Sequence, residues 1–93
     1  MSITKSNIQE KFDHFTSHWT PHVVAELNGQ AVKIAKIKGN FIWHKHDDED
    51  EMFWVIKGSM KMELRDQTLT LDEGDFTVIP KGVEHKPSAE DET

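Results

Sequence analysis

Cysteine is absent from this chain of 93 residues. Its absence excludes a disulfide framework and any thiolate metal site, so a metal ion would have to be bound by imidazole and carboxylate groups. No apolar run approaches the ~20 residues that cross a bilayer, and residues 1–5 lack the apolar core of a signal peptide. These absences predict a soluble protein with a cytoplasmic location and no membrane partner.

Positive charge is also scarce. The 17 acidic residues outnumber the 11 basic ones, and the net charge is -6. Such a field repels phosphate-rich partners, so no nucleic acid is expected as a ligand. The length fits one domain, but a domain this short buries only ~60–65% of its unfolded surface, and a metal ion or a second subunit would help to stabilise it. We therefore expect a homodimer.

The first 22 residues predict a helix followed by a lead-in segment. Apolar side chains recur there at spacings of four, three and four residues, at Ile8, Phe12, Phe15 and Trp19. This spacing is typical of one stripe of an amphipathic helix. Ser6 with Gln9 fits a capping box, and Pro21 disfavours helical geometry in the residue before it. The pattern therefore predicts a helix over residues 6–19.

Residues 23–93 predict one all-β domain. Short runs rich in Val, Ile, Phe and Trp are separated by Gly, Asp and Asn, a pattern typical of a sandwich or barrel. Asn28-Gly29 favours a type I′ turn, so residues 23–27 and 31–37 are expected to form a hairpin. The acidic tail, residues 89–93, is expected to fray. The other candidate strands cover residues 41–46, 51–56, 59–64, 68–71 and 76–79.

Two histidines stand two residues apart in one of these candidate strands. His44 and His46 would leave the same face of the strand, together with Ile42, and can converge on one ion. A buried pair of imidazoles without partners would cost several kcal/mol, and a metal ion that coordinates one nitrogen of each removes that penalty. Taken alone, the pair is also compatible with a solvated strand edge or with a structural pair whose hydrogen bonds are satisfied.

An acidic run, residues 47–51, follows the two histidines. Its first four carboxylates are expected to lie in a solvated loop, since like charges repel one another. Glu51 differs because strand alternation places it on one face with Phe53 and Val55, which are candidates for the interior. A carboxylate at the inward end of a strand needs a cation or hydrogen-bond donors nearby. The neighbouring imidazoles and their metal ion would supply them.

A third segment, which begins at Gly74, ends in another histidine. The strand in it stops at Pro80, and a turn at Gly82 reverses the chain so that His85 begins the next segment. In an antiparallel meander this return would bring His85 back beside His44. Taken alone, His85 is also compatible with an exposed loop position.

Together these residues resemble the two sequence motifs of the cupin superfamily. The first motif has Gly, then His-x-His, three or four residues, Glu, six residues and Gly. The second has Gly, five residues, Pro-x-Gly, two residues and His. The matching positions, which span about residues 31–88, are Gly39, His44, His46, Glu51 and Gly58 in the first motif and Gly74, Pro80, Gly82 and His85 in the second.

The resemblance implies a small single-domain cupin, that is, a jelly-roll β-barrel with a short N-terminal helix. It also implies that His44, His46, Glu51 and His85 hold one divalent metal ion. Zn(II), Mn(II), Fe(II), Ni(II) and Cu(II) all suit three nitrogens and one oxygen. A small molecule is the expected ligand, and no catalytic residue is assigned. Three functions stay open: a sugar-phosphate isomerase similar to mannose-6-phosphate isomerase, an Fe(II) dioxygenase and a non-catalytic ligand-sensing barrel.

The chain departs from the cupin pattern in three places. Four residues instead of five separate Gly39 from His44, and Ala89 stands where cupins usually have Asn. The sequence also stops at Thr93, where cupins generally continue with another strand. An open barrel, a strand from a partner or a fragment of a longer chain would each account for this, and an exposed edge would favour pairing with another subunit.

The remaining histidines and tryptophans are expected to lie outside the metal site. His14, His18 and His22 are interpreted as ordinary surface or packing residues, because no carboxylate completes a metal-binding arrangement with them. Trp43 and Trp54 alternate with the proposed interior positions. Each would therefore face away from the site, where a dimer interface would bury it.

Overall fold

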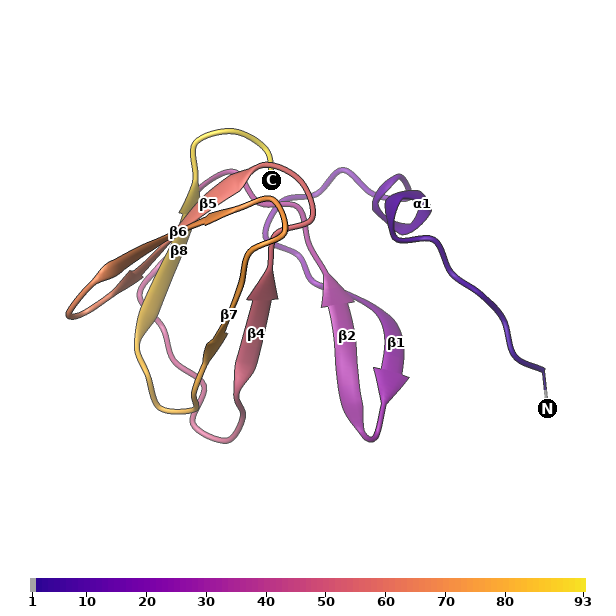
Figure 1. Cartoon of the computed structure of the whole chain (residues 1–93), viewed down its shortest axis with the longest axis horizontal. Helices are drawn as coiled ribbons and strands as arrows, with labels where there is room; N and C mark the ends of the chain where they lie inside the picture. The colour runs from indigo at the N-terminus through magenta and orange to yellow at the C-terminus, as the bar shows by residue number, and fades with distance from the viewer. Residues whose placement is uncertain (1) are drawn as a thin grey trace. The chain divides into compact units, whose positions relative to one another are not determined.

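The computed structural model describes residues 2–93. The chain divides between Lys36 and Ile37 into two compact units. The first unit contains the helix α1 and a β-hairpin, and the second contains the strands β3 to β8 (Figure 1). The fold is all-β with a short N-terminal helix, as the sequence predicts.

The helix is much shorter than predicted. α1 spans Ile8–Phe12, and its N-cap is Asn7, whose side-chain oxygen accepts a hydrogen bond from the backbone N–H of Glu10 at 2.9 Å. The predicted cap at Ser6 is therefore wrong by one residue. No helix among residues 2–93 is long and apolar enough to cross a membrane.

The chain leaves the helical path because its next residues pair with a strand end instead. Trp19 has a φ of 61°, in the left-handed region that helical residues do not occupy. Its backbone N–H donates to the carbonyl of Lys36 at 2.8 Å, and His18 forms a parallel bridge with the same residue. The predicted extension to residue 19 is thus wrong, because tertiary pairing overrides the amphipathic spacing.

The predicted hairpin is present. β1 (His22–Leu27) pairs antiparallel with β2 (Gln30–Ile34), and Leu27 stands opposite Gln30. Asn28 and Gly29 have φ values of 52° and 76°, so both central residues lie in the left-handed region that a type I′ turn requires.

The second unit contains a four-stranded antiparallel sheet in the order β3-β8-β5-β6 and a two-stranded pair, β4 with β7. The sheet strands are β3 (Gly39–Asn40), β5 (Ser59–Leu64), β6 (Thr68–Asp72) and β8 (His85–Ala89). The pair is β4 (Glu51–Trp54) with β7 (Phe76–Ile79). The core of this unit consists of Val55, Met60, Met62, Leu71, Ile79 and Ala89.

Residues 41–46 do not form the predicted strand. β3 ends at Asn40, and the backbone N–H of Phe41 still donates to Pro87, but pairing resumes only where His44 bridges His85. Phe41 and His44 are three residues apart, whereas their partners in β8, Pro87 and His85, are two residues apart. The extra residue on one side is a β-bulge. The bulge breaks side-chain alternation, so Ile42 is 67% exposed and does not share an inward face with His44.

The tail does not fray, contrary to the prediction. Ala89 is buried in the core, and the backbone N–H and carbonyl of Thr93 both bond to Ile37, at 2.9 and 2.8 Å. The Thr93 hydroxyl also donates to the carbonyl of Ser59 at 3.0 Å. These bonds hold residues 89–93 against the second unit despite their acidic composition.

Candidate metal centre

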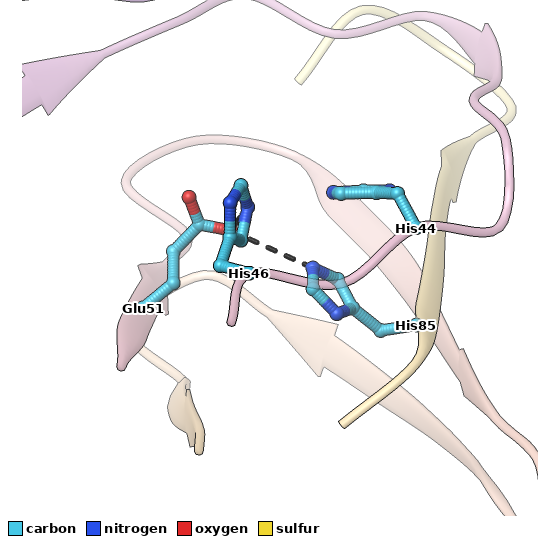
Figure 2. Close-up of side chains that lie close together, drawn as sticks. All are labelled: His44, His46, Glu51 and His85. Atoms are coloured by element: carbon cyan, nitrogen blue, oxygen red, sulfur yellow. Dashed lines mark ion pairs between the residues drawn. The ribbon is translucent and has the colours of Figure 1, made fainter. Parts of the chain in front are cut away.

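The four residues proposed from the sequence come from three separate segments of the second unit. His44 and His46 lie in the loop between β3 and β4, Glu51 is the first residue of β4, and His85 is the first residue of β8. Figure 2 shows their side chains turned toward a common space. One potential ligand atom from each residue lies within 4.8 Å of all the others. The structure thus brings together all four residues.

Backbone hydrogen bonds hold the three histidines in place. His44 and His85 exchange two of them: the N–H of His44 donates to the carbonyl of His85 at 3.0 Å, and the reverse bond is 2.9 Å long. The N–H of Gly82, in the turn before β8, donates to the carbonyl of His46 at 2.7 Å. The second motif therefore anchors the first motif directly.

Glu51 is oriented as its strand position predicts. It stands opposite Ile79 in the β4–β7 pair and shares its face with Phe53 and Val55. Val55 is buried in the core, and the ring of Phe53 lies 5.8 Å from the ring of His85, centroid to centroid. Phe53 therefore forms an apolar wall beside the carboxylate and the imidazole.

The hydrogen bonds of two rings select the tautomer that a metal ligand needs. Nδ1 of His44 lies 2.9 Å from the carbonyl oxygen of Ile42, and Nδ1 of His85 lies 2.9 Å from that of Val83. A carbonyl oxygen only accepts, so each Nδ1 carries the proton in these bonds. Each Nε2 is then left with a free lone pair, and this carbonyl–imidazole arrangement is typical of metal-bound histidine.

The strongest indication that these residues can hold a cation is the Nε2 atom of His85. His85 is 1% exposed, and its Nε2 has no hydrogen-bond partner among the described residues. Oε1 of Glu51 lies 3.6 Å from this atom and 3.5 Å from Nε2 of His46. Both distances exceed those of good hydrogen bonds. A buried lone pair beside a carboxylate is unfavourable unless a cation or a proton lies between them, and a metal ion bound to both atoms meets this requirement.

The spacing of the donor atoms also fits a metal ion. Zn–N and Zn–O bonds are about 2.0–2.2 Å long, so two ligands of one ion lie roughly 3–4 Å apart. The observed separations of up to 4.8 Å need an inward shift of no more than about an ångström on binding. Three imidazole nitrogens and one carboxylate suit Zn, Mn, Fe or Ni.

The acidic loop beside the site is exposed, as predicted, but one of its members has an unpredicted contact. Asp50 accepts a hydrogen bond from the backbone N–H of Lys81 at 2.9 Å, which ties the loop to the turn after β7. Asp47 pairs with Lys45 at 3.4 Å. No sequence signal separates Asp50 from its acidic neighbours, because the contact depends on a turn 31 residues away.

The other three histidines do not join a metal-binding group. His14 and His18 are exposed, and among residues 2–93 three or more potential ligands come together only at His44, His46, Glu51 and His85. His22 is half-buried and stacks on Phe15 with 3.9 Å between ring centroids. The interpretation of these three as surface or packing residues agrees with this arrangement.

Comparisons with known proteins define the class. Residues 32–93 match the Cupin domain family, so the chain belongs to the cupins. A solved cupin-2 domain containing protein from Shewanella frigidimarina NCIMB 400 is 48% identical, with a TM-score of 0.91 over 94% of this chain and 85% of that one. A solved protein from Neisseria meningitidis is 26% identical, with a TM-score of 0.87 over 96% of this chain and 91% of that one. The fold is accordingly of the cupin, jelly-roll-like type.

Two curated proteins are also similar in sequence. An uncharacterized protein of Bacillus subtilis (strain 168), YdbB, is 32% identical over 82 residues, which cover 87% of this chain and 66% of that protein. An acireductone dioxygenase of Puccinia graminis f. sp. tritici is 37% identical over 57 residues, which cover 55% of this chain and 31% of that protein. The chain therefore spans just under two thirds of the first relative and about a third of the second.

Proposed function

We propose that this cupin binds one divalent metal ion through His44, His46, Glu51 and His85 and binds a small molecule beside it. The observation that carries the proposal is the buried, unpartnered Nε2 of His85, which faces a carboxylate and two further imidazoles. A divalent ion held there would act as a Lewis acid toward an oxygen atom of the bound molecule.

Burial around the four residues defines the direction of approach. The side chain of His85 is 1% exposed, whereas those of His46 and Glu51 are 35% and 38% exposed. A small molecule would therefore reach the centre from the side of His46 and Glu51. Phe53, next to His85, would exclude water from the inner side and favour a ligand with an apolar part.

An Fe(II) dioxygenase is the enzymatic version that has most support. The relative named acireductone dioxygenase aligns over 57 residues of this chain, and imidazole with carboxylate is the donor set that Fe(II) oxygenases use. A sugar-phosphate isomerase has less support. Lys45 forms an exposed ion pair with Asp47, and Lys61 is an exposed residue between the buried Met60 and Met62, so neither side chain favours a phosphate at the centre.

Elemental analysis of the purified protein tests the metal site. We expect about one equivalent of a divalent metal in the wild-type chain and nearly none in a His44→Ala, His46→Ala double variant. Both proteins should show the same far-ultraviolet circular dichroism, so that lost binding is separated from lost fold. Equal metal content in the two folded proteins would refute the site.

The reaction is tested on protein loaded with one defined metal. Oxygen consumption by the Fe(II)-loaded protein with a panel of enediol-type and thiol-type small molecules would support the dioxygenase. Conversion of sugar phosphates by the Mn(II)-loaded or Zn(II)-loaded protein would support the isomerase instead. Saturable ligand binding without turnover in either assay would support a ligand-sensing barrel.

A homodimer remains our prediction for the quaternary structure. The outward face of the β4–β7 pair carries two exposed apolar cross-strand pairs, Met52 with Val78 and Trp54 with Phe76. These side chains leave roughly 400–500 Å² of apolar surface uncovered, which is at the upper end for a monomer. Light scattering after size exclusion should give twice the chain mass, and a Trp54→Thr, Phe76→Thr variant should give the single mass. The prediction would be contradicted if the wild-type protein gave the single chain mass at two loading concentrations that differ about 100-fold.

A further inference from the structure

The side chain of Arg65 contacts two other side chains of the second unit, Trp43 and Glu84. Arg65 is the sole arginine of the chain. Its guanidinium carbon lies 3.8 Å from the centroid of the Trp43 ring, and its Nη2 donates to Oε2 of Glu84 at 3.0 Å. A planar guanidinium can stack on an aromatic face and pair with a carboxylate at the same time.

Both partners of Arg65 are the immediate neighbours of proposed metal ligands. Trp43 precedes His44, and Glu84 precedes His85. The two histidines form the backbone bridge described above, with bonds of 3.0 and 2.9 Å. Leu64 pairs with His85, and consecutive residues of an extended chain point to opposite faces, so the side chain of Arg65 leaves on the face away from the His85 imidazole.

The position of Arg65 along the chain lets it span three neighbouring segments. It follows Leu64, which pairs with His85 across β5 and β8. His44 bridges His85 from the other side of β8. The side chain of Arg65 therefore passes Glu84, the residue just before β8, and ends over Trp43 in the segment beyond.

The segment of His44 needs such an additional contact. It follows the bulge after Asn40, and its pairing with β8 at this point is an isolated bridge instead of a continuous ladder. Beyond the two bonds of this bridge, the segment is held by single backbone bonds from Phe41 to Pro87 and from Gly82 to His46, so it opens more readily than the interior of a strand. A shift of the Trp43 backbone would move the His44 imidazole by a similar distance.

We propose that Arg65 is a positioning residue of the metal centre, one that holds His44 and His85 in register from the outer face of the sheet. This inference rests on the proposed metal-binding function. An exposed ion pair contributes little to global stability. Loss of an outer contact that orients metal ligands, by contrast, typically weakens metal affinity by about 10–100-fold. Arg65 should therefore act on metal affinity more than on folding.

The test compares Arg65→Met and Arg65→Lys with the control Lys86→Met. Lys86 directly follows the proposed ligand His85 and forms an ion pair with Glu63 at 3.7 Å between β8 and β5. Lys86→Met therefore tests the loss of an ion pair beside the centre while the contact of Arg65 with Trp43 is kept. Each protein, stripped of metal and folded, is titrated with Co(II), which gives the dissociation constant and the visible ligand-field spectrum. The unfolding temperature of each metal-free protein is measured in parallel.

We expect Arg65→Met to raise the Co(II) dissociation constant by about 10–100-fold and to change the ligand-field spectrum. Arg65→Lys should fall between Arg65→Met and the wild type, since an ammonium group keeps the charge near Glu84 but cannot stack as a planar group. Lys86→Met should stay within about twofold of the wild type, and the metal-free unfolding temperatures of all four proteins should agree within about 3 °C.

Two results would overturn the inference while the metal site itself stands. One is a wild-type dissociation constant and spectrum in Arg65→Met. The other is a loss of affinity that Lys86→Met shares and that follows a lower unfolding temperature of the metal-free protein, which would make Arg65 a stabilising residue only. A wild-type protein that binds no Co(II) would instead remove the proposed function, and the positioning role with it.

Discussion

The six histidines of this protein fall into two sets of three that have different surroundings. The first unit contains His14, His18 and His22, and the second contains His44, His46 and His85. Each set includes one buried Nε2 without a hydrogen-bond partner, that of His22 or that of His85. His22 lies against an aromatic ring, whereas His85 lies beside Glu51 and two imidazoles. The candidate metal site is distinguished by the convergence of its histidines on a carboxylate. Neither the number of histidines nor their burial distinguishes it.

The architecture of the two units explains the difference. The first unit has a two-stranded hairpin in which Ile34 is the one buried hydrophobic residue, and such a hairpin is marginally stable by itself. The second unit has a four-stranded sheet and a strand pair around a common core. Only the second arrangement brings His85 together with side chains that lie 34 to 41 positions before it. Backbone hydrogen bonds hold both His85 and the segment of His44 and His46 in place.

The two buried Nε2 atoms provide the sharpest test of this comparison. Replacing His85 with Ala should weaken Co(II) binding by at least about 100-fold, because a ligand and its oriented imidazole are lost. Replacing His22 with Ala should leave binding within about twofold, although it removes an equally unpartnered nitrogen. Isothermal titration of the two variants measures both effects. Equal losses would mean that the histidine sets do not differ in the way the structure indicates.

Glycine-to-alanine substitutions compare the two units by the loss of unfolding free energy that each change causes. Gly58, in the second unit, has a φ of +98°, and an added Cβ would lie 2.6 Å from Oγ1 and 3.2 Å from the backbone Cα of Thr93. Gly58→Ala should therefore lower the free energy of unfolding by about 2–4 kcal/mol. Gly29 in the hairpin has a φ of +76° but open space around it, so Gly29→Ala should cost only about 1 kcal/mol. Urea unfolding curves measure both values, and a smaller effect at Gly58 would contradict the tight packing of the tail.

The two glutamates near His46 test whether convergence or mere proximity matters. Oε1 of Glu51 lies 3.5 Å from Nε2 of His46, and Oε1 of Glu49 lies 4.0 Å from Nδ1 of the same ring. Glu51→Gln should weaken Co(II) binding by roughly tenfold, since it removes the charged ligand. Glu49→Gln should leave it within about twofold, because that side chain is 70% exposed. Similar losses in both variants would assign the effect to general charge.

The smallest effect is expected for the exposed histidines of the first unit. A His14→Ala, His18→Ala variant should bind about one equivalent of Co(II) with unchanged affinity. Its free energy of unfolding should change by less than about 1 kcal/mol, as is usual for exposed positions. Any loss of bound metal in this variant would show that the first unit contributes ligands.

Several strands follow from local patterns alone. Residues 59–64 and 76–79 form strands with the predicted bounds, and Asn28-Gly29 makes the predicted turn. Alternation along residues 51–55 correctly placed Glu51, Phe53 and Val55 on one face. Period-two patterns and turn dipeptides are decided by nearest neighbours, so they can be found without the fold.

The three largest errors share one cause, which is pairing with distant residues. Trp19 continues an apolar helical stripe in the sequence but bonds to Lys36 in the structure. Residues 41–46 alternate like a strand but carry a bulge where they meet β8. The acidic tail resembles a free end, yet Thr93 is bonded to Ile37 and Ser59. None of these partners lies within reach of a local pattern.

The sequence by itself determined which side chains are available as ligands, because the combined spacing of His44, His46, Glu51 and His85 matches a two-part motif that isolated histidines do not. The tertiary structure alone decided that these atoms meet and that Nδ1 of His44 and of His85 bonds to a carbonyl, which leaves Nε2 to face the neighbouring ligands. It also decided that Arg65 reaches Trp43 and Glu84 from the opposite face. The physical reason is that residue type and spacing are properties of the chain. Convergence, tautomer and packing depend instead on hydrogen bonds between strands that are far apart in sequence.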